Sequence, residues 1–333
     1  MGEIERFFQA RYEQARAARG LGTEDDDERL IRQRLGTFDS GIRGKPITLE
    51  RVACPGYTRE RIELSVLPGL TFKAYVLVPD GPGPFHSLLA VHGHGYGSRE
   101  IVGLPPDGGN GPVPVTGHRQ FAVSLVRRGL LVVAPDVLGF GERRFEAEAK
   151  GDTAVEWSCY LMAARLLLEG KTLAGLRVAE AEGCLDYIKD RGDVIPRTIG
   201  AFGFSGGSLI AAYLAILRKE ISAIVLSGFA NTFRESIMSV KHCIDNYVPG
   251  ILAIGEQPEL LSLLAPRPLF LEGGSEDPIF PKKGFMECVD VVGRAYAKAG
   301  AEERFGWDLF KGTHEVSGGR SFDWIANELK GMH

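Results

Sequence analysis

The stretch GAFGFSGGSLIAAYLA, residues 200–215, decides the fold class of this chain. An apolar run leads into a glycine-rich turn with Ser205 at its centre, and an Ala- and Leu-rich segment typical of a helix follows. A strand, a tight G-x-S-x-G turn and a helix form a nucleophile elbow, which exposes the serine at the carboxyl edge of a sheet. The turn alone does not distinguish a nucleophile from a small residue among glycines, because the chain has 43 glycines in 333 residues.

Short apolar runs on both sides of this stretch predict a parallel sheet, since such runs are typical of strands buried on both faces. The runs lie at residues 87–93, 129–136, 198–205, 221–228 and 267–274, with a weaker one at 304–310. Helical patterns separate them, at about residues 118–128, 172–190, 206–218 and 283–299. Strands that alternate with helices predict a doubly wound, mostly parallel sheet of the α/β class.

The N-terminal part of the chain has a different pattern. Residues 47–78 alternate apolar and polar side chains between Pro/Gly turns, which predicts antiparallel strands leading into the sheet. Helical patterns at 3–19 and 24–35 carry many charges, so we expect two exposed helices. The predicted organisation is an N-terminal helical extension over 1–45 and an α/β catalytic domain over 46–333.

Two connections are longer than is usual in a compact α/β domain. One is the Gly- and Pro-rich segment 94–117, and the other is 137–171, which contains the apolar helical pattern WSCYLMAARLLL. Long connections of this kind are often lids or pocket walls. We therefore expect 137–171 to form a lid or cap segment over the site, or to serve an interface.

The charge balance excludes several classes of partner. The net charge is −4 and no basic stripe or block is present, which argues against a nucleic-acid surface and an anionic membrane surface.

No apolar stretch reaches the roughly 20 residues that cross a bilayer, and the N-terminus has no signal-peptide pattern. Five scattered cysteines without a CxxC spacing predict reduced, mostly buried thiols rather than a disulfide framework. We expect a cytoplasmic protein.

A serine of ordinary pKa needs a histidine to accept its proton and a carboxylate to orient that histidine. In an elbow fold the acid and then the histidine follow the serine, each in a loop after a later strand. Asp277 follows the run at 267–274, with its neighbour Glu276 as the rival acid. His314 follows the run at 304–310. The predicted catalytic residues are therefore Ser205, Asp277 and His314.

An oxyanion hole requires two N–H donors aimed at the developing negative charge. Gly206, directly after the serine, supplies one donor, and the H-G-H-G turn at residues 92–95 supplies the other. We assign the second donor to His94, with Gly95 as the alternative. The rings of His92 and His94 could instead brace the loop or line the pocket. A metal site on H-x-H is disfavoured because the sequence suggests no nearby carboxylate or third ligand; we predict no metal.

We expect a substrate pocket beside the predicted catalytic residues. Its walls are expected to come from residues 94–117, from 137–171 and from the segment around His242. Apolar helix residues more often face a core than a pocket. The candidate lining residues are His92, Gly95, Tyr96, Phe204, Trp157, Tyr160, His242 and Tyr247.

Beyond these motifs, the chain from about residue 70 to its end resembles the α/β-hydrolases, and in particular the bacterial acetyl-xylan-esterase and dienelactone-hydrolase-like esterases. The resemblance is carried by HGHG, APDVLGFGERR at 134–144, GFSGG, SGFANTFRESIM at 227–238, HCIDNYVPGI at 242–251, LLAPRPLFLEGGSEDPIFP at 263–281 and GTHEVSG at 312–318. It implies the same roles for Ser205, Asp277 and His314. The chain departs from the acetyl-xylan deacetylases at Gly206, where they have glutamine, and from the dienelactone hydrolases, whose nucleophile is cysteine.

The predicted function is a serine hydrolase that cleaves carboxylic esters through an acyl-enzyme intermediate without a cofactor. Its partner would be a small-molecule ester, small or sugar-type, and the N-terminal helices could also serve a homo-oligomer. One alternative is a peptidase or amidase of the prolyl-oligopeptidase kind, although only about 70 residues precede the central strands, too few for the propeller of those enzymes. Another is an inactive hydrolase fold that acts as a binding protein.

Overall fold

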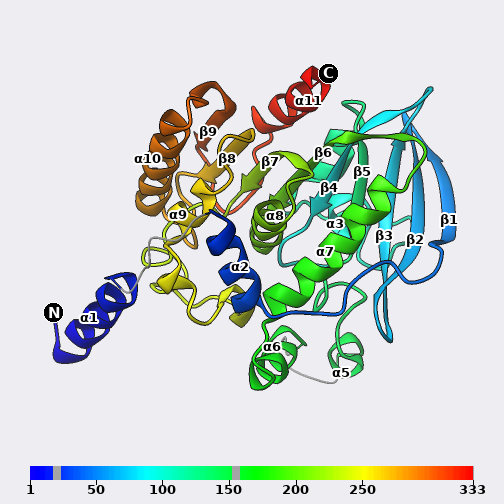
Figure 1. Ribbon diagram of the computed structural model, residues 1–333. Coiled ribbons are helices and arrows are strands. Elements are labelled where there is room, and N and C mark those ends of the chain that lie inside the picture. The colour runs from blue at the N-terminus through cyan, green and yellow to red at the C-terminus, as the bar shows by residue number, and fades with distance from the viewer. Residues whose placement is uncertain (18–23, 152–157, 333) are drawn as a thin grey trace.

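One mixed sheet organises the residues that the structure describes, which are 1–17, 24–151 and 158–332 of a computed structural model. The sheet has nine strands in the order β1-β2-β3-β5-β4-β6-β7-β8-β9 (Figure 1). The strands are β1 Ile47–Cys54, β2 Tyr57–Leu67, β3 Leu70–Pro79, β4 Phe85–Val91, β5 Leu131–Pro135, β6 Val194–Phe204, β7 Ile221–Ser227, β8 Leu269–Gly274 and β9 Phe305–Phe310.

Helices flank this sheet. The α-helices are α1 Glu3–Ala17, α2 Glu24–Leu35, α3 Ser98–Ile101, α4 Phe121–Val126, α5 Glu146–Ala149, α6 Ser158–Leu168, α7 Leu173–Lys189, α8 Gly206–Leu217, α9 Gln257–Ser262, α10 Lys282–Lys298 and α11 Ser321–Gly331. Three short 3-10 turns, η1 Ile244–Asn246, η2 Ile251–Ala253 and η3 Glu302–Arg304, complete the described elements.

The direction of the strands confirms the predicted fold class. β1, β2 and β3 pair antiparallel, and β3 is antiparallel to β5. From β5 to β9 every neighbouring pair is parallel. In a parallel sheet the carboxyl ends of the strands meet at one edge, so the loops after β4, β6, β8 and β9 are brought together.

Both faces of the central strands are buried, as the apolar runs indicate. In β4, Leu89 and Val91 belong to one apolar core, while Leu88 and Ala90 belong to the other. This alternation follows from the two-residue period of a strand. An unbroken apolar run is therefore the pattern that a strand between two cores requires.

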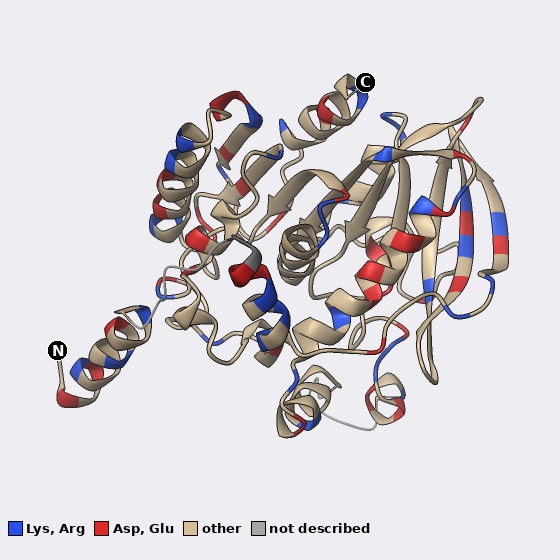
Figure 2. Ribbon diagram, viewed as in Figure 1, with Lys and Arg blue, Asp and Glu red and all other residues tan. Residues whose placement is uncertain are grey.

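Each face has its own helices. α2, α7, α8 and α10 contribute to the core on one face, and α4 and α11 to the core on the other (Figure 1). The sequence analysis missed α11, whose apolar residues Phe322, Ile325 and Leu329 repeat at helical spacing and are buried. Acidic and basic residues are interspersed on the outer helices and on β1 and β2 (Figure 2).

The N-terminal helices differ from each other in burial. α1 has no buried residue and lies at the edge of the molecule (Figure 1), tied through Tyr12 to Glu256 and through Arg16 to Glu259. α2 was also expected to be exposed, and that was wrong, because Ile31 and Leu35 are buried where it packs against α7. Among the described residues, no helix combines the length and apolar character needed to cross a membrane. The division at residue 45 stays a prediction.

Candidate active site

The turn between β6 and α8 carries Ser205 in a strained conformation. Its φ is 55° and its ψ is −122°, outside the regions that residues with a side chain favour. Such a conformation costs about 1–3 kcal/mol and persists only where the surroundings impose it. Here β6 ends at Phe204 and α8 begins at Gly206, so the turn is one residue long. The strand and the helix therefore hold Ser205 at the carboxyl edge of the sheet.

Two glycines make this turn sterically feasible. A Cβ on Gly203 would lie 2.4 Å from the Cα of Ser208, and one on Gly207 would lie 2.1 Å from the carbonyl oxygen of Val91. Neither distance is compatible with a side chain, because backbone atoms cannot move aside easily. Position 206 is different, since its nearest neighbour to an added Cβ is the His94 ring at 3.4 Å. The ring of His94 thus lies close to the turn at Gly206.

Ser205, His314 and Asp277 form a hydrogen-bonded relay. The Nε2 atom of His314 lies 2.8 Å from the Oγ of Ser205, and its Nδ1 lies 2.7 Å from the Oδ2 of Asp277. A carboxylate only accepts, so Nδ1 carries the hydrogen and Nε2 is left to accept from the serine hydroxyl. Ser205 and Asp277 are buried, while His314 is partly exposed. This is the geometry in which an imidazole can take a proton from a serine.

The turn after β8 determines which carboxylate faces His314. The Oδ1 of Asp277 accepts hydrogen bonds from the backbone N–H groups of Ile279 and Phe280, at 2.8 and 3.0 Å. These bonds leave Oδ2 for the histidine. Glu276 is exposed and contributes only its backbone N–H to this turn. The geometry therefore favours Asp277 over the rival acid.

A buried carboxylate that the sequence analysis missed holds the histidine loop in place. Glu272, in β8, accepts from the hydroxyls of Ser227 and Ser321 and from the backbone N–H groups of Ser317 and Gly318. Burial raises the pKa of Glu272, although these four donors oppose the shift. A polar residue at the end of an apolar run was the available signal. Glu272 links β7, β8 and the loop that carries His314.

The H-G-H-G turn after β4 places two rings differently. The His92 ring is buried, its Nε2 accepts from the N–H of Val137 at 2.9 Å, and its Nδ1 faces the carbonyl of Gly93 at 2.7 Å. His92 therefore braces the loop, and the expectation that it lines the pocket was wrong because its ring is enclosed. His94 is partly exposed, and its ring packs against Phe140 with centroids 4.6 Å apart.

The first donor predicted for an oxyanion hole, the N–H of Gly206, opens α8. The first four N–H groups of a helix have no acceptor within it, so this group is available to a ligand. The backbone of His94 lies in the adjacent loop. The assignment of His94 as the second donor, with Gly95 as its alternative, stays a prediction.

His118, which sequence reasoning treated only as the start of a helix, also braces this loop. Its Nε2 accepts from the N–H of Gly93 at 3.0 Å, and its Nδ1 pairs with Glu100 at 2.8 Å. The other oxygen of Glu100 accepts from the N–H of Tyr96. Burial lowers the pKa of His118, with the Glu100 pair opposing the shift.

This lowered pKa predicts a pH effect on stability. The unfolded chain takes up a proton on His118 near its ordinary pKa of 6.5, whereas the folded protein does so only at lower pH. Protonation of His118 in the unfolded chain therefore lowers the free energy of unfolding as pH falls through 6.5. Above that pH, His118 causes no such loss of stability. Urea unfolding at pH 5.5 and 7.5 should show a smaller pH-dependent loss for His118→Gln than for the wild type. An equal loss in both proteins would contradict the prediction.

A cavity of about 1110 Å³ lies beside the relay. Its walls come from the His94 loop, the 139–148 region, the start of α6 and residues 241–247. His242, in that wall, packs on Phe280, which stacks on the His314 ring. Of the predicted pocket residues, the structure places the following in the wall: Gly95, Tyr160, His242 and Tyr247. His94, predicted as an oxyanion donor, also lies in this wall.

Three other predicted pocket residues lie elsewhere. Phe204 is buried between the rings of His118 and His314, because it is the last residue of a central strand. Tyr96 is not part of the cavity wall, and its hydroxyl donates to the carbonyl oxygen of Leu104. These two predictions, like that for His92, were wrong. Trp157 lies outside the described residues. Of segment 94–117, only His94 and Gly95 contribute to the cavity wall.

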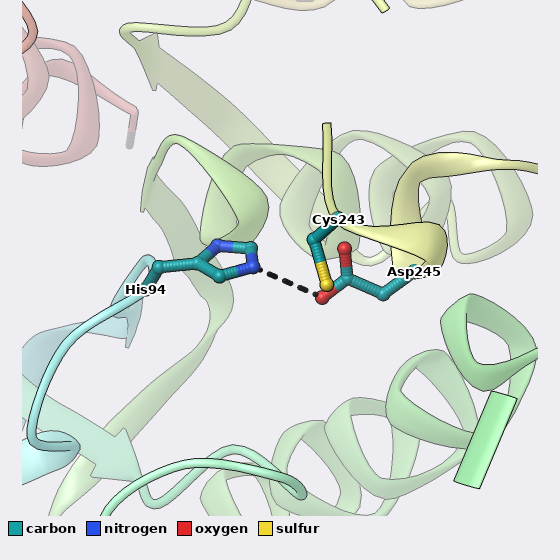
Figure 3. Close-up of side chains that lie close together, drawn as sticks. All are labelled: His94, Cys243 and Asp245. Atoms are coloured by element: carbon teal, nitrogen blue, oxygen red, sulfur yellow. Dashed lines mark ion pairs between the residues drawn. The ribbon is translucent and has the colours of Figure 1, made fainter. Parts of the chain in front are cut away.

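Three polar side chains, His94, Cys243 and Asp245, lie close together where η1 approaches the H-G-H-G turn (Figure 3). The Nε2 of His94 lies 3.5 Å from the Oδ2 of Asp245, and ligand atoms of His94, Cys243 and Asp245 lie within 4.8 Å of one another. The expectation that no carboxylate or third ligand lies near the H-x-H turn was therefore wrong, because η1 brings both there. The same Oδ2 also accepts from Arg177 at 2.5 Å, so a cation already neutralises this carboxylate.

Arg177 is the most heavily bonded member of this cluster. It lies inside α7, where its guanidinium donates to the carbonyl of Leu138, to Asp245 and to the Sγ of Cys159. Burial alone would raise the pKa of Asp245, but the charges of Arg177 and then His94 outweigh it and hold that pKa below its usual range. Sequence reasoning missed both residues, since a single arginine in a helix is usually solvated.

The fold agrees with that of the proteins to which the chain is similar. A family model described as the Abhydrolase family matches residues 28–311. The chain belongs to the Abhydrolase family. This Abhydrolase family member is also 28% identical over 230 residues to the Bacillus subtilis (strain 168) protein YtaP, a match that covers 66% of this chain and 70% of YtaP.

Solved structures show the same fold for this Abhydrolase family member. A Bacteroides fragilis NCTC 9343 protein described as an acetyl xylan esterase superposes with a TM-score of 0.73 at 20% identity, covering 91% of this chain and 82% of that one. Methylesterase BT1017 gives 0.69 at 22%, covering 93% of this chain but 63% of its own. A glucuronoyl esterase from Solibacter usitatus gives 0.62 at 12%, covering 93% and 92%.

Proposed function

We propose that this protein is a serine hydrolase of carboxylic esters that works through an acyl-enzyme intermediate. The observation that carries the proposal is the relay of Ser205, His314 and Asp277, with hydrogen bonds of 2.8 and 2.7 Å, on a strained turn beside a large cavity. Nucleophile, base and orienting acid are each held by a different loop of the sheet edge. Family membership supports a hydrolytic reaction at this position.

The proposed reaction begins with attack of the Ser205 Oγ on the ester carbonyl. His314 takes the serine proton at Nε2, and Asp277 stabilises the imidazolium that forms. The N–H of Gly206 and, as the proposed second donor, that of His94 stabilise the negative oxygen. His314 returns its proton to the leaving alcohol. A water molecule activated by His314 then releases the acid and restores Ser205. The residues in these steps need no cofactor.

The proposed substrate is a small ester or an ester on a carbohydrate. A cavity of about 1110 Å³ exceeds the usual range for a small ligand and leaves room for an alcohol of sugar size. Tyr160 and Tyr247 in its wall are exposed and could pack against such a ring. The names of the structural neighbours, an acetyl xylan esterase and a glucuronoyl esterase among them, agree in chemical class.

A fluorophosphonate probe tests this proposal, because it phosphonylates only an activated serine. We expect stoichiometric labelling of the peptide that contains Ser205, found by mass spectrometry, with loss of p-nitrophenyl acetate hydrolysis in parallel. An unlabelled Ser205 would indicate an inactive fold. Hydrolysis of an aminoacyl-proline amide without ester turnover would favour the peptidase alternative.

A further inference from the structure

Two cysteines line the cavity wall from elements that pack against each other. Cys159 is the second residue of α6, and Cys243 directly precedes η1, which packs against α6. Both line the cavity and both belong to the cluster around Asp245: the Sγ of Cys159 accepts from Arg177 at 3.1 Å, and the Sγ of Cys243 lies within 4.8 Å of an Asp245 carboxylate oxygen. Cys159 is buried and Cys243 half-buried. A pair of thiols from two different elements, open to the same cavity, is the arrangement that a reversible disulfide requires.

The surroundings of Cys159 favour its thiolate. The Nη2 of Arg177 lies 3.1 Å from its Sγ, and a guanidinium at this distance stabilises a thiolate. The hydrogen bond from Cys243 lowers the pKa of the Cys159 thiol, burial raises it, and Arg177 lowers it again, with a net downward shift.

Two of the other cysteines are buried in a different environment. Burial raises the pKa of Cys184 and Cys288, so both stay as thiols. The interaction with Cys159 and burial also raise the pKa of Cys243. Because the Arg177 guanidinium contacts the Sγ of Cys159 at 3.1 Å, we assign Cys159 as the attacking sulfur and Cys243 as the resolving sulfur.

We propose that peroxide oxidises Cys159 and Cys243 to a disulfide. This bond would link α6 to the η1 segment, narrow the cavity beside Ser205 and lower the rate of hydrolysis. The proposal goes beyond ester hydrolysis and assigns a modification site whose reactant is hydrogen peroxide or a small hydroperoxide.

Each step of the oxidation balances. The Cys159 thiolate attacks one oxygen of hydrogen peroxide, the O–O bond breaks, and the leaving hydroxide takes up the proton released by the thiol. Cys159 becomes a sulfenic acid and the peroxide yields one water. The sulfur of Cys243 then attacks the Cys159 sulfur, the S–O bond breaks, and hydroxide leaves with the Cys243 proton as a second water. Two thiols and one peroxide give one disulfide and two waters.

The bond would alter the site through Arg177 and Asp245. Bringing the sulfurs to about 2.05 Å draws Cys159 from the guanidinium and Cys243 from its place beside His94 and Asp245 (Figure 3). Asp245 faces the His94 ring, and that ring lies next to Gly206. A small displacement of groups around a reacting centre can cost up to about 10²-fold in rate, so we expect hydrolysis to fall about tenfold.

Peroxide treatment of the full-length protein with EDTA present tests the inference. The wild type should lose two of its five thiols, counted after denaturation with a chromogenic disulfide. The peptides of Cys159 and Cys243 should appear cross-linked in a non-reduced digest, and dithiothreitol should restore all five thiols. Cys159→Ser should keep its four thiols, and Cys243→Ser should accumulate a dimedone adduct on Cys159. Cys54→Ser, which changes the other half-buried thiol, should still form the cross-link.

These readouts separate the inference from the proposed function. Failure of the cross-link, or equal thiol loss in Cys159→Ser, would overturn the disulfide whatever the enzyme hydrolyses. Each protein is compared with its own untreated rate on p-nitrophenyl acetate, and only the wild type and Cys54→Ser should slow down reversibly. A fully cross-linked enzyme of unchanged rate would overturn the effect on the cavity. No ester turnover before treatment would count against the proposed function alone.

Discussion

Replacing Ser205 by alanine should lower kcat for p-nitrophenyl acetate by ~10⁴-fold or more, while the protein stays folded. The hydroxyl is the atom that bonds the carbonyl carbon, and no other group can substitute for it once the relay has lost its first member. His314 and Asp277 would keep their hydrogen bond, since neither depends on the serine for its position. Initial rates over a range of substrate concentrations measure the effect.

Ser208→Ala is a matched control for this variant. Ser208 lies one turn further along α8, and its buried hydroxyl donates to the carbonyl oxygen of Ser227 rather than to the relay. The same atom is removed from the same helix, so any general effect of the substitution appears in both proteins. If Ser205→Ala remained as active as Ser208→Ala and the wild type, Ser205 would not be the nucleophile.

The second large effect is expected on stability, from Arg177→Met. This substitution keeps the apolar stem but leaves the Asp245 carboxylate buried without its guanidinium, and it removes the donors to Leu138. Losing one partner of a buried ion pair costs about 3–5 kcal/mol, because the remaining charge is not solvated. Urea unfolding at pH 7 should show this decrease in the free energy of unfolding.

A second substitution tests the reason for the loss. Adding Asp245→Asn should recover part of the stability, since the unpaired charge is then gone. Arg294→Met, at the exposed pair with Asp290 on α10, should change the free energy of unfolding by only about 0.5 kcal/mol or less. A double variant no more stable than Arg177→Met alone would mean that packing, not charge, accounts for the loss.

The relay could be predicted from the sequence because each of its members follows a strand of the sheet. The apolar runs located those strands, and a parallel sheet gathers their carboxyl ends at one edge. Order along the chain therefore selected His314 and limited the acid to Asp277 or its neighbour Glu276, and the hydrogen bonds of the turn favour Asp277. The α/β class followed from the same runs. For these residues, the position along the chain relative to a strand also determines the position in the folded protein.

The cavity wall could not be predicted in the same way. Arg177 projects from a buried helix and Asp245 from a short turn, and their pairing depends on how α7 packs against η1. No periodicity in either segment encodes that contact. Tyr96 and Phe204 are neighbours of motif residues in the chain, but chain position did not determine where their side chains point. Phe204 ends a strand, whose successive side chains point to opposite faces, and Tyr96 lies in an irregular loop and donates to Leu104.

The two histidines of the H-G-H-G turn have different tolerance to substitution. The ring of His92 supports the loop backbone, whereas the ring of His94 lies in the cavity wall. The His92 ring and its neighbour His118 fix the backbone from within, through the amides of Val137 and Gly93. The ring of His94 faces the cavity. Position 94 can therefore drift, or be randomised in a library, to change the choice of substrate while the backbone beside Ser205 keeps its course. Substitutions at this one position can therefore change which esters are accepted while His92 and His118 keep the loop backbone in place.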